Sequence, residues 1–182
     1  MSDFQNRKLI FWLVSHCKTG IKREEYVEKL KEFVEIDIYG KCTGNECSKK
    51  GNDCFQNLSM NYMFYLAFEN SICDEYVTEK FYRSLLFPIV PVVMGGADYK
   101  SIAPPKSYID VNDFANVKQL AQFLIKLSKN KVLLAKLIND FNFGTFLPIR
   151  FFPFFRKNII LILIGNKIIK FIFGSPFANY AI

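Results

Sequence analysis

Short apolar runs along the first 130 residues alternate with longer segments in which apolar residues recur at helical spacing. Three of these runs are rich in aromatic or β-branched residues and too short for a helix, which predicts buried strands. They are LIFWLVS at 9–15, FYLAF at 64–68 and IVPVVM at 89–94. Two shorter stretches, IDIY at 36–39 and YIDV at 108–111, predict further strands.

Three segments between these strands have the apolar spacing of amphipathic helices. The first begins at Arg23, and the third covers residues 117–127. The second begins after Thr78, whose side chain can cap a helix, and Pro88 stops it after about two to three turns. The predicted buried positions are Tyr26, Val27, Leu30, Phe33, Val34, Phe81, Leu85, Leu86, Leu120, Ala121, Leu124 and Leu127.

Strands that alternate with helices predict an α/β fold with a doubly wound parallel sheet, which is Rossmann-like. We expect residues 1–130 to form one domain and residues 131–182 to form an atypical apolar tail. The tail has no helical period, and polar residues interrupt any apolar run near the roughly 18 residues that a membrane span needs. We therefore hypothesise an abnormal terminus, such as translated non-coding sequence or a frameshift. Residues 40–61 hold Gly, Asn, Ser, Lys and three cysteines, which predicts a loop that disulfides tie down.

Ligands of open parallel sheets bind beyond the carboxyl ends of the strands, and one loop at that position is dense in polar residues. The loop carries Glu69, Asn70, Tyr76, Thr78, Glu79 and Lys80. A free amide at Thr78 and the cation of Lys80 suit a phosphate, and Glu79 can accept hydrogen bonds from sugar hydroxyls. This favours a sugar nucleotide as the ligand. The alternative is that Glu69 and Lys80 are solvated charges at a helix end.

Arg23 falls in the first turn of its predicted helix, where a cation is unfavourable for the helix dipole. It is therefore either an indifferent surface residue or a residue placed to meet an anion. His16 is the only histidine, and its position in a loop after a strand is more typical of a structural than of a catalytic residue. The candidate site therefore does not include His16.

Three motifs in the central segment resemble the donor-binding signature of the α1,3/4-fucosyltransferases, which form glycosyltransferase family 10. They are FYLAFENS at 64–71, EYVTEKF at 75–81 and VPVVMGG at 90–96, and they stand in the family's order. The similarity covers about residues 8–130 and includes FWLVSHC at 11–17. The resemblance implies the C-terminal, donor-binding half of a GT-B glycosyltransferase.

The resemblance implies an inverting enzyme that transfers fucose from GDP-fucose to N-acetylglucosamine of a glycan or glycoprotein, in α1,3 linkage. It places Arg23 and Lys80 at the donor pyrophosphate, and Asn70, Tyr76 and Glu79 on the ribose, fucose and guanine side. Glu69 fits either a donor contact or a structural carboxylate paired with a backbone amide. No cofactor or metal is required, and no convincing D-x-D motif follows a strand.

In the family, the catalytic base lies in a preceding acceptor domain, which no part of this sequence matches. We therefore expect a fragment that binds GDP-fucose weakly and transfers fucose poorly. A second class stays open, namely a catalytically incompetent nucleotide-sugar-binding fragment or an interaction module. A generic binding domain without sugar chemistry fits less well, because EYVTEKF and VPVVMGG match together and in order.

Composition bears on the partners and on the compartment. The 182 residues carry a formal charge of +7, which suits an anion such as a nucleotide diphosphate, and the chain lacks the basic clusters with interleaved aromatics that bind nucleic acid. Five cysteines without the spacing of a zinc site, and a glycosylation sequon at Asn57, are compatible with an oxidising lumen, and the odd count predicts an unpaired thiol or a partner outside the chain. We see no membrane anchor before the first strand. The family's enzymes carry an N-terminal membrane anchor, and the resemblance therefore implies the lumenal side of the Golgi cisterna membrane.

Overall fold

A computed structural model of the chain describes residues 6–45, 52–103, 106–140, 159–164 and 167–172. The chain divides into two compact units, Met1–Phe141 and Asn142–Ile182. The second unit contains an antiparallel pair of strands, β6 (Ile159–Ile164) and β7 (Lys167–Ile172). The expectation of an abnormal terminus lies mostly outside the described residues.

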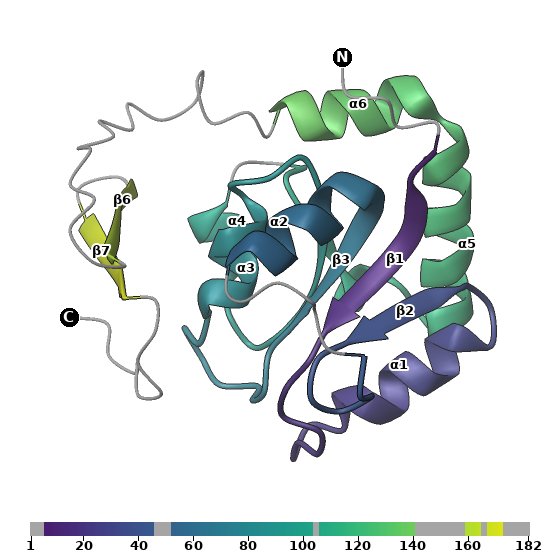
Figure 1. Ribbon diagram of the computed structural model, residues 1–182, viewed down its shortest axis with the longest axis horizontal. Coiled ribbons are helices and arrows are strands. Elements are labelled where there is room, and N and C mark those ends of the chain that lie inside the picture. Colours follow the sequence, from purple (N-terminus) through teal and green to yellow (C-terminus); the bar gives the residue numbers. More distant parts are fainter. Residues whose placement is uncertain (1–5, 46–51, 104–105, 141–158, 165–166, 173–182) are drawn as a thin grey trace. The chain divides into compact units, whose positions relative to one another are not determined.

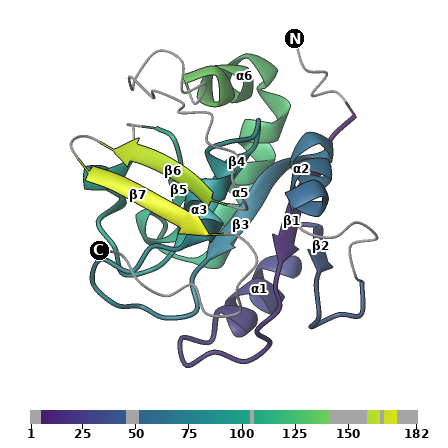
Figure 2. The same cartoon turned by 60° about the vertical axis from the view of Figure 1, so that its left-hand side comes forward.

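The first unit is built on a five-stranded parallel sheet with the order β2-β1-β3-β4-β5 (Figure 1). The central strands β1 and β3 lie side by side in both views (Figures 1 and 2). The strands are β1 (Lys8–Leu13), β2 (Ile36–Tyr39), β3 (Tyr62–Phe68), β4 (Val90–Met94) and β5 (Ile109–Asp110). All five predicted strands are confirmed, with ends that shift by one or a few residues.

Helices cover both faces of the sheet, as the doubly wound prediction requires. One face carries α1 (Arg23–Lys31), α5 (Val117–Lys129) and α6 (Lys131–Asp140). The other face carries α2 (Asn52–Asn61), α3 (Glu79–Ser84) and the short α4 (Tyr99–Ile102), and a 3-10 turn (Val111–Asp113) follows β5. The α/β doubly wound fold is therefore confirmed.

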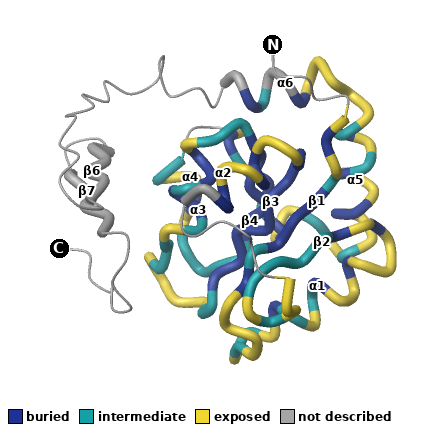
Figure 3. The backbone as a smooth tube through the Cα atoms, viewed as in Figure 1, coloured by how far each residue is buried: buried dark blue, intermediate teal, exposed yellow. Residues whose placement is uncertain are grey.

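The strands are buried because helices pack against them from both sides, which explains their continuous apolar runs. Every residue of β3 is buried, and Figure 3 shows β1, β3 and β4 as the buried centre of the domain. Ile10, Phe64 and Val92 join the core under α1 and α5. Phe11 and Tyr65 stack on the opposite face, where the ring of Phe55 from α2 contacts both.

The prediction that residues 40–61 form a loop is wrong for the second half of this segment, where α2 forms. The helix buries Cys54, Phe55 and Leu58, which share one helical face, against the sheet. The abundance of Asn, Ser and Cys concealed this short apolar face. The expectation of a disulfide is met by the Cys17–Cys42 bond, and Cys54 is also disulfide-bonded. Cys73 is free and exposed.

Helix α6 follows α5 directly and packs on the same domain. Its residues Leu134 and Ile138 are buried in the core cluster under α5. The packed core of the first unit thus includes residues of α6 as far as Ile138. In the described part of the chain, every helix is too short or too polar to cross a bilayer.

Candidate functional site

The order of the strands creates a switch point between β1 and β3, which are neighbours in the sheet. The chain leaves β1 toward α1 on one face, and it leaves β3 toward α3 on the other face. The loops at the two carboxyl ends therefore diverge, and ligands of doubly wound sheets bind where such loops separate. The polar loop predicted from the sequence, residues 69–80, begins at this point.

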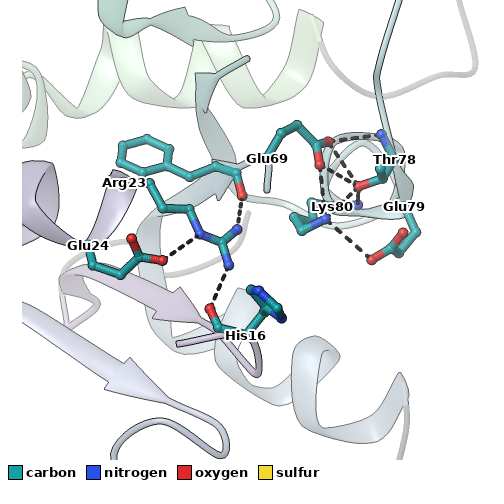
Figure 4. Close-up of polar contacts among 8 residues, drawn as sticks. His16, Arg23, Glu24, Glu69, Thr78, Glu79 and Lys80 are labelled. Carbon is teal, nitrogen blue, oxygen red and sulfur yellow. Dashed lines mark hydrogen bonds and ion pairs between the residues drawn. The ribbon is translucent and has the colours of Figure 1, made fainter. Parts of the chain in front are cut away.

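Arg23 joins the carboxyl ends of the two strands at the switch point (Figure 4). Its Nη1 donates to the carbonyl oxygen of Phe68 at 2.6 Å, and its Nη2 donates to that of His16 at 3.0 Å. Its Nε lies 3.4 Å from the carboxylate of Glu24, and its guanidinium lies 5.5 Å from the ring centroid of Trp12. Only 2% of Arg23 is exposed, so the interpretation of an indifferent surface residue is wrong.

Glu69 follows β3 directly, and its backbone N–H extends the ladder by donating to Met94. Its carboxylate is fully buried and accepts hydrogen bonds from the backbone N–H of Thr78 at 2.9 Å and from the Thr78 hydroxyl at 2.7 and 2.9 Å. The ammonium of Lys80 donates to the same carboxylate at 2.9 Å (Figure 4). Three donor groups, the Thr78 amide and hydroxyl and the Lys80 ammonium, therefore satisfy the buried charge, as a buried carboxylate requires.

These contacts correct two expectations. The Thr78 amide is not free for a phosphate, because the Glu69 carboxylate already occupies the position of an anion there. Glu69 and Lys80 are not solvated charges, since Glu69 is buried and the Lys80 side chain is 16% exposed. Of the two roles left open for Glu69, the structural carboxylate that pairs with a backbone amide is the one observed.

The other predicted site residues lie around this ion pair. Glu79 is exposed in the first turn of α3, with its carboxylate 3.8 Å from the Lys80 ammonium. Asn70 is half-buried, and its Oδ1 has no hydrogen-bond partner among the described residues. Tyr76 is half-buried, and burial, followed by the charges of Glu69 and Glu79, raises the pKa of its phenol. Asn70 and Tyr76 thus lie in the loop after β3, and Glu79 and Lys80 lie in the first turn of α3.

Sequence reasoning missed the loop that follows β4. A Cβ at Gly95 would lie 2.6 Å from Tyr99 Oη and 3.4 Å from Cγ of Glu69, and a Cβ at Gly96 would lie 2.7 Å from the carbonyl oxygen of Cys73. The two glycines therefore let this loop contact the polar loop after β3. The GG pair in VPVVMGG was a usable signal, whereas nothing in the sequence singled out Tyr99.

Replacing Gly96 by alanine is expected to destabilise the domain by about 1 to 3 kcal/mol, because the new methyl group would press on the Cys73 backbone. The free energy of unfolding in urea measures this loss. Gly20→Ala is the matched control, since a Cβ there meets nothing within 4 Å, and its effect should stay within about 1 kcal/mol. Equal effects of the two substitutions would contradict the close approach of the loops.

Carboxylates offset both cations of the site. Arg23 lies beside Glu24, and Lys80 lies between Glu69 and Glu79. Among the described residues, no three His, Cys, Asp or Glu side chains gather in a way that would hold a metal ion. Arg23 and Lys80 are the two cations of the predicted site, and each is already engaged within the protein.

The fold and the site define the class of an α/β domain whose polar loops meet at a switch point, which is where nucleotide-binding domains hold their ligands. The family model described as glycosyltransferase family 10 (fucosyltransferase) C-term matches residues 4–139. The chain therefore belongs to glycosyltransferase family 10, and it carries the C-terminal domain of that family.

Individual relatives agree with this family. Alpha-(1,3)-fucosyltransferase C of Drosophila melanogaster is 50% identical over 117 residues, which are 64% of this chain and 28% of the relative. Alpha-(1,3)-fucosyltransferase fut-1 of Caenorhabditis elegans is 42% identical over 121 residues, which are 66% of this chain and 28% of the relative. A crystal structure of an alpha1,3-fucosyltransferase with GDP-fucose matches with a TM-score of 0.64 at 25% identity, covering 75% of this chain and 40% of that protein. The chain thus spans about a quarter to two fifths of the length of these relatives.

Proposed function

We propose that this chain binds GDP-fucose at the switch point and serves the transfer of fucose to an acceptor. The observation that carries the proposal is the pair of cations, Arg23 and Lys80, at the carboxyl ends of β1 and β3. Both residues lie within the part that matches the family. The solved relative with GDP-fucose supports the choice of donor, because its fold superposes on three quarters of this chain.

In this proposal Arg23 and Lys80 hold the diphosphate. Three of the five N–H groups of Arg23 are engaged by Phe68, His16 and Glu24, which leaves two for a ligand. Lys80 has a flexible stem and reaches the diphosphate by turning away from Glu69. Two cations at this position offset the negative charge that develops on the leaving GDP as the bond to fucose breaks.

The half-exposed groups of the loop contact the rest of the donor. Glu79 is exposed and accepts hydrogen bonds from ribose or fucose hydroxyls, while Asn70 and Tyr76 contact the ribose, fucose or guanine. The unpaired Oδ1 of Asn70 supports a ligand contact, since buried polar atoms rarely stay without a partner. The base that takes the proton of the acceptor hydroxyl is not among these residues in the proposal.

The remaining parts of the proposal concern acceptor, cofactor and compartment. The acceptor is N-acetylglucosamine of a glycan, and fucose is added with inversion. The proposed α1,3 linkage agrees with the names of the two relatives reported above. The transfer uses no metal, because the two side-chain cations take that role. The lumenal side of the Golgi membrane is the proposed location, and the Cys17–Cys42 disulfide supports an oxidising compartment.

Calorimetric titration of the full chain with GDP tests the donor site. Lys80→Met should weaken GDP binding by about 10- to 100-fold, since one charge-assisted hydrogen bond to a phosphate is lost. Lys118→Met, which removes the same charge from the exposed face of α5, should leave the affinity unchanged. Equal affinities of the two variants would contradict the assignment, and transfer of labelled fucose to an N-acetylglucosamine acceptor tests the reaction itself.

A further inference from the structure

The ion pair of Lys80 with Glu69 poses a problem for the proposed donor site. Lys80 cannot turn to a diphosphate without leaving a fully buried carboxylate that has lost its cation. The remaining donors to Glu69 are the amide and the hydroxyl of Thr78. An uncompensated buried charge is costly, so the bound state needs a replacement donor for Lys80.

Tyr99 offers such a donor. Its ring packs against Phe81 and Tyr108 with centroid distances of 5.2 and 5.5 Å, so that only 2% of the residue is exposed. Its hydroxyl is nevertheless without a hydrogen-bond partner in the described part of the chain. Buried hydroxyl groups are normally paired, and an unpaired one in a packed cluster calls for an explanation.

The Tyr99 hydroxyl and Cγ of Glu69 both lie close to Gly95. The two border the same small space, because the position of a Cβ at Gly95 is 2.6 Å from Tyr99 Oη and 3.4 Å from Cγ of Glu69. Gly95 has no side chain to separate them. The electrostatics agree with this proximity, since burial raises the pKa of the Tyr99 phenol and the negative charge of Glu69 raises it further.

We propose that Tyr99 is a positioning residue whose hydroxyl donates to Glu69 when Lys80 turns to the diphosphate. In the free protein the Lys80 ammonium donates to the Glu69 carboxylate, and the Tyr99 hydroxyl has no hydrogen-bond partner among the described residues. In the bound protein Tyr99 replaces Lys80, and Glu69 keeps both its charge and its contacts to Thr78. This inference rests on the proposed function only for the identity of the anion that attracts Lys80.

The first test needs no ligand and compares the thermal stability of four chains: wild type, Tyr99→Phe, Lys80→Met and the double variant. Tyr99→Phe should shift the melting temperature of the wild type by less than about 1 °C, because the hydroxyl that it removes is unpaired. In the Lys80→Met background the Tyr99 hydroxyl already donates to Glu69. There, Tyr99→Phe should lower the melting temperature by about 3 to 6 °C. Equal shifts in the two backgrounds would overturn the proposal.

The second test is the affinity for GDP. Tyr99→Phe should weaken GDP binding about tenfold in the wild type and leave it unchanged in the Lys80→Met background. Tyr108→Phe is the matched control, since it removes a hydroxyl from the same aromatic cluster without Glu69 among the charges that act on it, and it should not change the affinity. Tyr99→Phe with wild-type affinity would overturn the inference while the donor site stands. If the wild type bound no GDP, the proposed function would fail, and the stability test would still decide whether Tyr99 can replace Lys80.

Discussion

Arg23→Met is expected to destabilise the domain by about 2 to 5 kcal/mol, because two carbonyl oxygens lose a charged donor. The substitution keeps an apolar stem but leaves the carbonyl oxygens of Phe68 and His16 without their donor. Both atoms lie where the chain leaves the central strands, so the loops that form the site would loosen first. Urea unfolding measures the loss of stability.

Lys22→Met is the control for this experiment. It removes the same charge one residue earlier, from a side chain that is 70% exposed and pairs with the exposed Glu25, so its effect should stay within about 1 kcal/mol. A small effect of Arg23→Met on stability would mean that Arg23 acts in ligand binding and not in holding the two loops. In that case the affinity for GDP should fall while the free energy of unfolding stays unchanged.

Removing the Cys17–Cys42 disulfide by a double substitution to serine should cost about 3 to 4 kcal/mol. The bond closes a segment with a sequence separation of 25, and the loss follows from the entropy that the unfolded chain regains. A melting temperature lower by about 10 °C is the expected measurement. The disulfide also ties the loop after β1, which carries His16, to the turn after β2.

Cys73→Ser is the matched control for the disulfide. Cys73 is free and exposed, so this substitution should leave the melting temperature unchanged. If the double serine variant melted together with the control, the disulfide would not constrain the unfolded chain. The two results together separate the loss of the bond from the chemistry of the thiol.

Patterns of apolar residues were enough to predict the sheet, because strands buried on both faces must be apolar throughout. Residues 36–39 were found by alternation alone, although β2 is short. The sequence predicts a helix of two to three turns after Thr78, but the α-helix ends at Ser84. From there to Phe87, each backbone N–H donates to the carbonyl oxygen three residues earlier, as in a 3-10 helix. Helix α2 was missed because its buried face is narrow and three of its 10 residues are asparagines.

The sequence could propose the residues of the candidate site, but not the contacts among them. Sequence order placed Glu69 and Lys80 in one loop, yet only the turn of the chain at Thr78 brings the three side chains together. The part of Arg23 in joining two strands could not be predicted, since its partners are carbonyl oxygens that every residue carries. The residue types favour one kind of ligand, whereas the backbone determines which polar groups are already bonded within the protein.

The buried carboxylate of Glu69 also has consequences for the rate at which anions bind at the site and for which anions bind there. If Lys80 must leave Glu69 before it binds an anion, the exchange of this internal ion pair limits the rate of binding. The net charge of +7 then contributes less to that rate than it would at an unpaired lysine. A small free anion such as chloride gains too little to displace Glu69, because it makes no further contact. The internal ion pair would thereby favour ligands that make further contacts on both sides of their phosphates over small free anions.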